Sequence, residues 1–225
     1  MNWLVRNQSA AAFVVHPSVG DEKRHVSVVP DVQPSPYFRW QPILAWIATA
    51  IATPVFVPLI GLLAVLVRLT SRGPGLYRQQ RVGKNGKLFW IYKIRTMQTD
   101  AEEETGPVWT DENDPRITPV GRWLRRLHLD ELPQIFNVLM GQMTLIGPRP
   151  ERPEFTQSLA RAIPGYLLRN KVLPGITGLA QINLPPDTDL DSVRRKLVLD
   201  LEYVEKANLW LDLRITLCTL LKMIG

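Results

Sequence analysis

The chain has 225 residues, 45% hydrophobic and 21% charged, which excludes an intrinsically disordered protein and allows one sizeable core or one domain with an appendage. Its formal net charge of +6 suits phosphate-bearing partners such as nucleic acid, anionic lipid or nucleotides. The single cysteine, Cys218, excludes an internal disulfide framework, and three scattered histidines do not predict a metal cluster. This use of cysteine points to chemistry in the cytoplasm.

Residues 1–38 mix short apolar pieces with the charged patch DEKRH and the proline-containing stretch PDVQPSPYF. Such a composition predicts an extension with a linker, and it assigns no chemistry to this part of the chain. We therefore predict three parts: the extension over 1–38, a membrane segment over 39–70 and a cytoplasmic domain over 71–225.

The membrane segment is predicted from residues 40–67, which contain no charged side chain; a buried core helix is the alternative. Pro54 and Pro58 lie in the middle of this run, and each removes a backbone donor and disfavours helix in the preceding residue. We expect two half-helices that enter and leave the bilayer by its cytoplasmic face, since arginines flank both ends. A single kinked span, with residues 1–38 on the other side, is the alternative, because prolines are tolerated in spanning helices.

A β-hairpin is predicted within residues 73–97, because Asn85-Gly86 separates two stretches rich in β-forming residues. A strand there would place Lys93 and Arg95 on one face, which is either solvated or binds phosphate.

Two short helices are predicted next. Thr118 is a suitable N-cap with Pro119 at the first helical position. Three arginines in this helix, spaced i, i+3 and i+4, share one face: Arg122, Arg125 and Arg126. The second helix covers LDELPQIFNVLMGQM, with Asp130 near its N-cap and Gly141 near its end.

A long amphipathic helix is predicted from apolar residues at helical spacing, namely Leu190, Val193, Leu197, Leu201 and Val204. The last stretch, NLWLDLRITLCTLLKMI, either lies at the membrane interface or completes the core. The predicted fold is therefore α+β and mostly helical, with a β-hairpin and interfacial amphipathic helices behind a re-entrant membrane segment.

Adjacent carboxylates, Asp130 and Glu131, follow the arginine cluster. Helix capping is the ordinary interpretation, because acids suit the first turn of a helix. The same position also suits chemistry. A helix N-terminus and arginines bind phosphate, and cations lower the pKa of a carboxylate. An ionised aspartate can attack phosphorus, and two carboxylates supply part of a Mg²⁺ site.

Other charged residues leave alternatives open. Arg149, in the rigid loop GPRP, is either a phosphate clamp or a surface arginine, and Asp200, in an apolar helical face, is expected to pair with a base. The glycines of PGITG do not match a nucleotide-binding fingerprint and are expected to make a turn.

Four motifs together resemble the bacterial sugar transferase family: RVGKNGKLFWIYKIRTM, DPRITPVGRWLRR, LDELPQIFNVLMGQMTLIGPRPE and LPGITGLAQIN. The resemblance, to the monotopic polyprenol-phosphate phosphoglycosyl transferases in their minimal form, extends over residues 40–225. It implies transfer of a sugar-1-phosphate from a UDP-sugar to a polyprenol phosphate, such as undecaprenyl phosphate, with Mg²⁺ and release of UMP. It also implies a re-entrant helix broken at Thr53-Pro54 and a place on the cytoplasmic face of the bacterial inner membrane.

The resemblance further implies roles for individual residues. Asp130 is the expected nucleophile, Glu131 holds Mg²⁺ or orients the nucleophile, and both are expected metal ligands. Arg149 and one or more of the three clustered arginines would hold phosphates. The remaining matches are Lys93 and Arg95 as phosphate-binding residues, and Asp200 and Gln134 as supporting residues.

Two departures leave the sugar undetermined: Leu184-Pro185-Pro186-Asp187 replaces the Gly-Arg of many relatives, and Thr96 replaces serine. The expected partners are the UDP-sugar, the polyprenol phosphate and the bilayer, with downstream glycosyltransferases or a second copy of the chain as further candidates. The alternative function is a catalytically silent membrane scaffold that binds nucleotide sugar or partner glycosyltransferases. Nucleic acid is not an expected partner, because the aromatic residues do not interleave with basic ones.

Overall fold

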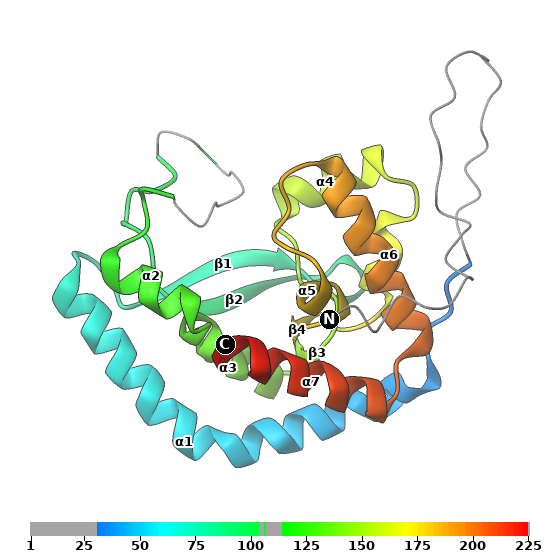
Figure 1. The fold of residues 1–225 in the computed structure, drawn as a ribbon, viewed down its shortest axis with the longest axis horizontal. Helices are drawn as coiled ribbons and strands as arrows, with labels where there is room; N and C mark the ends of the chain where they lie inside the picture. The colour runs from blue at the N-terminus through cyan, green and yellow to red at the C-terminus, as the bar shows by residue number, and fades with distance from the viewer. Residues whose placement is uncertain (1–30, 104–105, 107–113, 225) are drawn as a thin grey trace.

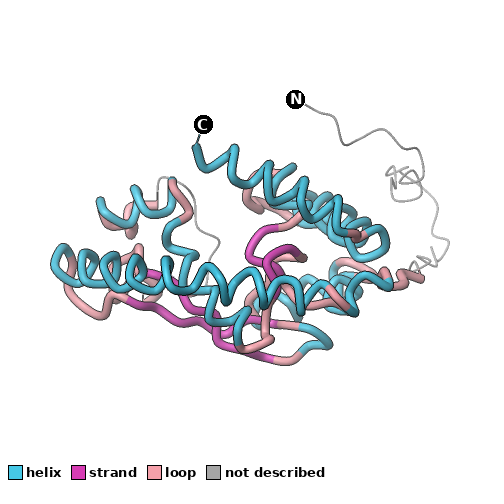
Figure 2. Tube along the Cα trace, turned by 90° about the horizontal axis from the view of Figure 1, so that it is seen from below, coloured by secondary structure: helices cyan, strands magenta, loops and turns pink. Residues whose placement is uncertain are grey.

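The computed structural model describes residues 31–103, 106 and 114–224. His16, His25 and most of the predicted extension lie outside these residues. The elements in chain order are η2 (Pro36–Arg39), α1 (Gln41–Thr70), β1 (Leu76–Val82), η3 (Lys84–Gly86), β2 (Leu88–Ile94), α2 (Pro119–Arg126), η4 (Leu129–Gln134), α3 (Ile135–Leu139), β3 (Thr144–Ile146), α4 (Pro153–Ala162), η5 (Tyr166–Lys171), β4 (Gly175–Thr177), α5 (Leu179–Asn183), α6 (Leu190–Lys206) and α7 (Leu209–Ile224), where η denotes a 3₁₀-helix. Figure 2 shows that helices dominate, with the strands confined to two small sheets.

Helix α1 is continuous over its 30 residues, with Pro54 and Pro58 inside it. The prediction of two separate half-helices is therefore wrong. Instead the helix curves beneath the rest of the molecule (Figure 1), because a helix can absorb a missing proline donor by bending. The hydroxyls of Thr49 and Thr53 donate to the carbonyls four residues earlier at 2.7 and 2.8 Å, an interaction that accompanies helix bending. By length and composition α1 is a candidate membrane segment, which indicates membrane association.

The predicted hairpin is confirmed. Strands β1 and β2 pair antiparallel, from Leu76 opposite Ile94 to Val82 opposite Leu88. Asn85 has a φ of 55° and Gly86 one of 78°, the left-handed conformations that Asn-Gly supplies in tight turns. The predicted N-cap of α2 is also present.

A second sheet, not predicted, pairs β3 with β4 in parallel. It lays the start of the GPRP loop beside PGITG. A Cβ on Gly175 would collide with the backbone nitrogen of Gly147, and one on Gly178 with the Gly147 carbonyl. These glycines therefore allow two backbones to touch, which goes beyond the turn expected of them.

Helix α6 forms the predicted amphipathic helix. Its buried residues include Val193, Leu197, Leu201 and Val204, whereas Leu190 at its first position is exposed. Part of the predicted extension joins this core: Val32 is buried in it, and the Ser35 amide donates to the Val204 carbonyl at 2.9 Å. The division of the chain at residue 38 stays a prediction.

Candidate active site

The adjacent carboxylates lie on η4, directly after a reversal of the chain. His128 precedes η4 with a φ of 52° and no side chain caps the helix. Asp130 is therefore in the first turn and does not act as the predicted N-cap. The left-handed His128 turns the chain sharply between α2 and η4, so that η4 approaches the hairpin.

Asn137 fixes this approach. Its side chain donates to the Trp90 carbonyl at 2.7 Å and accepts from the Tyr92 amide at 3.2 Å. Asn137 is fully buried, so both hydrogen bonds are shielded from water. Hydrogen bonds are electrostatically stronger in the protein interior than in water. An amide side chain thus bonds to the backbone of β2 on either side of Ile91, and it brings η4 alongside Lys93, which follows on the same strand.

Glu131 joins two cations from separate parts of the chain. Lys93 donates to its Oε1 at 2.8 Å, and Arg149 donates two bonds, to Oε1 at 2.5 Å and to Oε2 at 3.3 Å. Burial by itself would raise the pKa of Glu131, but Arg149 and Lys93 hold that pKa well below its ordinary value. The two cations thus favour the ionised form of Glu131, which in turn orients both of them.

Asp130 has a different environment. It is 7% exposed, and no described residue donates a hydrogen bond to its carboxylate. Burial raises its pKa, Lys93 opposes the shift and Glu131 adds to it. The nearby cations lower this pKa as expected, but the cost of desolvating the charge outweighs their attraction, so the pKa is raised overall. A carboxylate of raised pKa, free of hydrogen bonds, is a stronger nucleophile when it is ionised.

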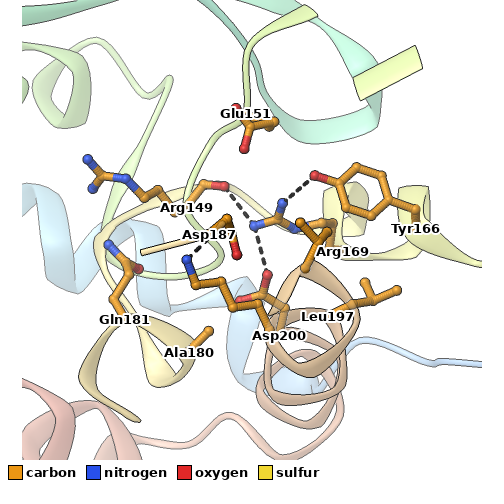
Figure 3. Close-up of a pocket in the computed structure, with 11 residues that line it drawn as sticks. Arg149, Glu151, Tyr166, Arg169, Ala180, Gln181, Asp187, Leu197 and Asp200 are labelled. Atoms are coloured by element: carbon orange, nitrogen blue, oxygen red, sulfur yellow. Dashed lines mark hydrogen bonds and ion pairs between the residues drawn. The ribbon is translucent and has the colours of Figure 1, made fainter. Parts of the chain in front are cut away.

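Arg149 is anchored through its backbone by Arg169, a residue that sequence reasoning missed. Arg169 Nη2 donates to the Arg149 carbonyl at 2.7 Å and forms an ion pair of 2.7 Å with Asp200, while Nη1 donates to the Tyr166 hydroxyl at 2.9 Å (Figure 3). The expectation that Asp200 pairs with a base is confirmed. The side chain of Arg149 is 42% exposed, so it can still reach a ligand.

The far end of the same loop is tied to β1. Arg81 donates to the Pro150 carbonyl at 3.2 Å, and the Val82 amide donates to the Glu151 carbonyl at 2.9 Å. Together with the close contact at Gly147, these bonds hold the loop on three sides. A loop held in this way presents its arginine at small entropic cost.

The predicted arginines of α2 divide into two groups. Arg125 is half-buried and donates to Thr96 Oγ1 at 2.9 Å; burial lowers its pKa and Asp130 opposes that shift, so its charge acts on the carboxylate. Arg122 and Arg126 are exposed and have no polar side-chain partner among the described residues.

Arg95 lies elsewhere. It follows the last residue of β2, Ile94, and its amide donates to the Gly75 carbonyl at 2.9 Å. Its guanidinium donates to the Pro74 carbonyl at 2.6 Å and to the Ser71 carbonyl at 3.0 Å. These bonds tie Arg95 to the segment that follows α1, and its role in phosphate binding stays a prediction.

Gln134 and the metal remain to be placed. Gln134 is 1% exposed, and its Nε2 has no hydrogen-bond partner within the part of the chain that the structure describes. Within the described ranges no group of three or more histidine, cysteine or acidic side chains could hold a metal. Asp130 has free oxygens and fits a Mg²⁺ ion that is otherwise ligated by substrate. Glu131 fits less well, because Lys93 and Arg149 already occupy both of its oxygens.

A small cavity of about 40 Å³ lies next to the Arg149 loop. Most of the residues that line it have charged or polar side chains, including Lys196 on α6. Figure 3 shows others from the loop, η5, α5, α6 and the segment before α6, among them Arg149, Arg169, Gln181, Asp187 and Asp200.

A family comparison decides the relationship of the chain to known proteins. The family described as "Bacterial sugar transferase" matches residues 38–225. The chain belongs to the bacterial sugar transferase family. The matched range includes α1 and every residue of the site described above.

Curated members of the bacterial sugar transferase family agree with this. The chain is 45% identical over 168 residues to the undecaprenyl-phosphate glucose phosphotransferase of Komagataeibacter xylinus, covering 72% of this chain and 32% of that one. It is 42% identical over 200 residues to the UDP-N-acetylgalactosamine-undecaprenyl-phosphate N-acetylgalactosaminephosphotransferase of Aeromonas hydrophila, covering 87% and 46%. It is 40% identical over 166 residues to the exopolysaccharide production protein PSS of Rhizobium leguminosarum bv. phaseoli, covering 72% and 83%. The chain thus spans less than half the length of the first two relatives.

Proposed function

We propose that the chain transfers a sugar-1-phosphate from a UDP-sugar to undecaprenyl phosphate, and so begins the synthesis of a lipid-linked glycan. The names of the relatives support this activity. The observation that carries the proposal is the carboxylate of Asp130, buried and free of hydrogen bonds to the described residues, beside cations that Glu131 holds in place.

In the first step Asp130 would attack the phosphorus that bears the sugar. The new bond joins an Asp130 oxygen to this phosphorus, the bond to the bridging diphosphate oxygen breaks, and UMP leaves with that electron pair. Lys93 and the exposed edge of Arg149 would stabilise the charge on the phosphoryl oxygens. Their positions are fixed before substrate arrives, since both are bonded to Glu131.

In the second step an oxygen of the polyprenol phosphate would attack the same phosphorus. The bond to Asp130 breaks, its carboxylate is restored, and the product is a polyprenyl diphosphate sugar. No proton has to move between these phosphate and carboxylate groups, so the site needs no separate general base. This agrees with the absence of a histidine from the charged cluster as described.

A Mg²⁺ ion would be held by Asp130 and substrate phosphates, and it would neutralise the charge that develops on the diphosphate. We infer that Glu131 takes the orienting role expected as the alternative to metal binding, because its oxygens are bonded to two cations.

We further propose that α1 is re-entrant. Its length, roughly 45 Å at 1.5 Å per residue, would suffice for a span, so length does not decide. The contacts at its ends support a return to the same face. Gln41 at its start donates to the Ile146 carbonyl at 2.9 Å. Val67 near its end is 1% exposed, within the core that also contains Ile94. Both ends are thus joined to one domain, on the face that would be cytoplasmic.

Helix α7 supports a place at the bilayer surface. Its large exposed apolar residues recur at helical spacing: Leu209, Trp210, Leu213, Leu217, Leu220 and Leu221. An apolar stripe with basic residues near it is typical of interfacial helices. Monotopic attachment through α1 and α7 would bring a soluble nucleotide sugar and a lipid headgroup to the same nucleophile.

The decisive experiment incubates the purified chain with UDP-sugars, undecaprenyl phosphate and Mg²⁺ and measures UMP. With the lipid omitted, a UDP-sugar that is labelled in the phosphate attached to the sugar should label the wild-type protein. Asp130→Asn should abolish both this labelling and the release of UMP. Asp191→Asn, which alters an exposed ion pair, is the matched control and should retain activity. Release of UDP in place of UMP, or turnover by Asp130→Asn, would overturn the mechanism. Nucleotide-sugar binding without UMP release would favour the alternative scaffold.

A further inference from the structure

Three residues that line the cavity beside Arg149 each have one buried polar atom without a hydrogen-bond partner among the described residues: Arg169 Nε, Gln181 Oε1 and Asp187 Oδ1. Buried polar atoms in proteins nearly always have a partner, and leaving one unsatisfied destabilises the fold. Three such atoms around one small cavity indicate that a group from outside the protein completes them.

Each of the three atoms belongs to a side chain that is fixed at its other end. Gln181 Nε2 donates to the Ile176 carbonyl at 2.9 Å. Asp187 Oδ2 pairs with Lys196 Nζ at 3.0 Å. The terminal nitrogens of Arg169 are used by Tyr166, Asp200 and the Arg149 backbone. The free atoms are therefore oriented by the protein before any ligand arrives.

The set of atoms defines the chemistry of the ligand. Two acceptors, one of them on a carboxylate, and one N–H donor suit hydroxyl groups, which both donate and accept. An ionised phosphate oxygen suits the free atoms less well than a hydroxyl, because it has no hydrogen to donate to Gln181 Oε1 or Asp187 Oδ1. A methyl group would leave all three atoms unsatisfied.

The size of the cavity agrees with a part of a sugar. Its volume of about 40 Å³ exceeds the roughly 10–15 Å³ that one water needs by the same measure. A hydroxyl with its carbon, or two neighbouring hydroxyls, can therefore enter while the rest of the ring stays outside.

The location connects the cavity to the reaction. Arg149 lines it while its guanidinium pairs with Glu131, and Arg169 both lines it and bonds to the Arg149 backbone. A substrate whose phosphate meets Arg149 can thus place a neighbouring group in the cavity.

We propose that Gln181, Asp187 and Arg169 form a subsite that hydrogen-bonds hydroxyl groups of the UDP-sugar and thereby orients it beside Arg149. The proposal rests on the proposed function. The hydroxyls can belong to the hexose or to the ribose, which present the same chemistry.

The test compares UMP release by wild type, Asp187→Asn and Gln181→Met over a panel of substrates. The panel contains the best UDP-sugar, analogues that lack single hexose hydroxyls, and the 2′-deoxy and 3′-deoxyuridine analogues. Asp187→Asn replaces one carboxylate acceptor by an amide donor and removes the charge, so we expect its kcat/KM for the full substrate to fall about 10- to 100-fold. Gln181→Met removes a neutral acceptor at similar volume and should cost about tenfold. Asp191→Asn is the control.

The decisive result is whether the effects of the substitution and of the missing hydroxyl are additive. If a hydroxyl binds in the subsite, the substitution should lower kcat/KM only slightly for the analogue that lacks this hydroxyl, because the bond between them is already absent. A hexose analogue or a ribose analogue behaving in this way identifies the source. Losses that multiply for every analogue, or variants that match wild type on the full substrate, would overturn the subsite. Failure of the proposed function gives a different result, since wild type itself would then release no UMP from any UDP-sugar. The thermal midpoint of each variant shows whether it is folded, and either variant alone suffices for the test.

Discussion

Arg169 holds Arg149 by its backbone carbonyl, at 2.7 Å from Nη2. The side chain of Arg149 is free to pair with Glu131 because its main chain is fixed by another residue. Arg169 is itself fixed by Asp200 on α6. The position of a phosphate-binding arginine thus depends on a buried ion pair that does not touch substrate phosphate.

Breaking that ion pair should lower both stability and activity. In Arg169→Met, Asp200 keeps a buried charge without its partner, and we expect the free energy of unfolding to fall by about 3–5 kcal/mol. The rate of UMP release should fall as well, because Arg149 loses its backbone anchor. Guanidinium-induced unfolding in detergent measures the first effect. Arg194→Met, which breaks an exposed pair with Asp191, should change stability by less than about 0.5 kcal/mol; equal effects of the two variants would contradict this role.

The pH dependence of activity should reflect Asp130. The nucleophile must be ionised, and burial raises its pKa, so the acid limb of kcat/KM should lie above the range of an exposed aspartate. Lys93 lowers this pKa, and Lys93→Met should therefore move the acid limb to higher pH. Lys93→Arg keeps the charge and should move it less. The position of the limb, rather than its height, is the measured quantity; a limb that moves to lower pH in Lys93→Met would be inconsistent with the geometry.

Backbone contact between the two loops predicts a strong effect of one methyl group. In Gly175→Ala the added Cβ would collide with the Gly147 backbone, and we expect a loss of roughly 1–3 kcal/mol in stability together with reduced activity. Gly61→Ala is the control, because nothing lies within 4 Å of its added Cβ and alanine favours a helix by up to about 1 kcal/mol. A Gly175→Ala variant as stable and active as Gly61→Ala would contradict the contact.

Topology can be read with cysteine labelling. In a Cys218→Ser background, Arg39→Cys and Arg72→Cys place one thiol near each end of α1, at exposed positions. A re-entrant helix predicts that a membrane-impermeant maleimide labels neither in intact spheroplasts and both in inverted vesicles. Labelling of one thiol from each side would mean that α1 spans the bilayer.

The sequence predicted elements whose causes are local. Asn85-Gly86 makes its turn by its own backbone preference, and Thr118 caps α2 by accepting from the Gly121 amide at 3.0 Å. Pro54 was misleading because a proline indicates a lost hydrogen bond, whereas a helix can continue past that loss by bending. The pairing of β3 with β4 was missed, since strands of three residues leave no readable alternation.

The site could be predicted in its chemical groups and only partly in its geometry. Asp130, Glu131 and Arg149 stood out because charge is unusual in those segments. That Lys93 meets Glu131 depends on Asn137 bonding to β2, a long-range contact without a sequence pattern. Arg169 lies on a short 3₁₀-helix with nothing in its neighbourhood to distinguish it from a surface arginine.

The bonds of Glu131 have a consequence for its neighbour. Among the residues that the structure describes, the cations donate hydrogen bonds to Glu131 of this acidic pair and none to Asp130. One carboxylate is thus committed to holding charge in place, and the other keeps its lone pairs for reaction. The dipeptide is not symmetric, although its two members carry the same charge. Exchanging them, as Asp130→Glu with Glu131→Asp, would preserve the composition and net charge of the protein. It would still displace both carboxylates, because the side chain at each position changes length.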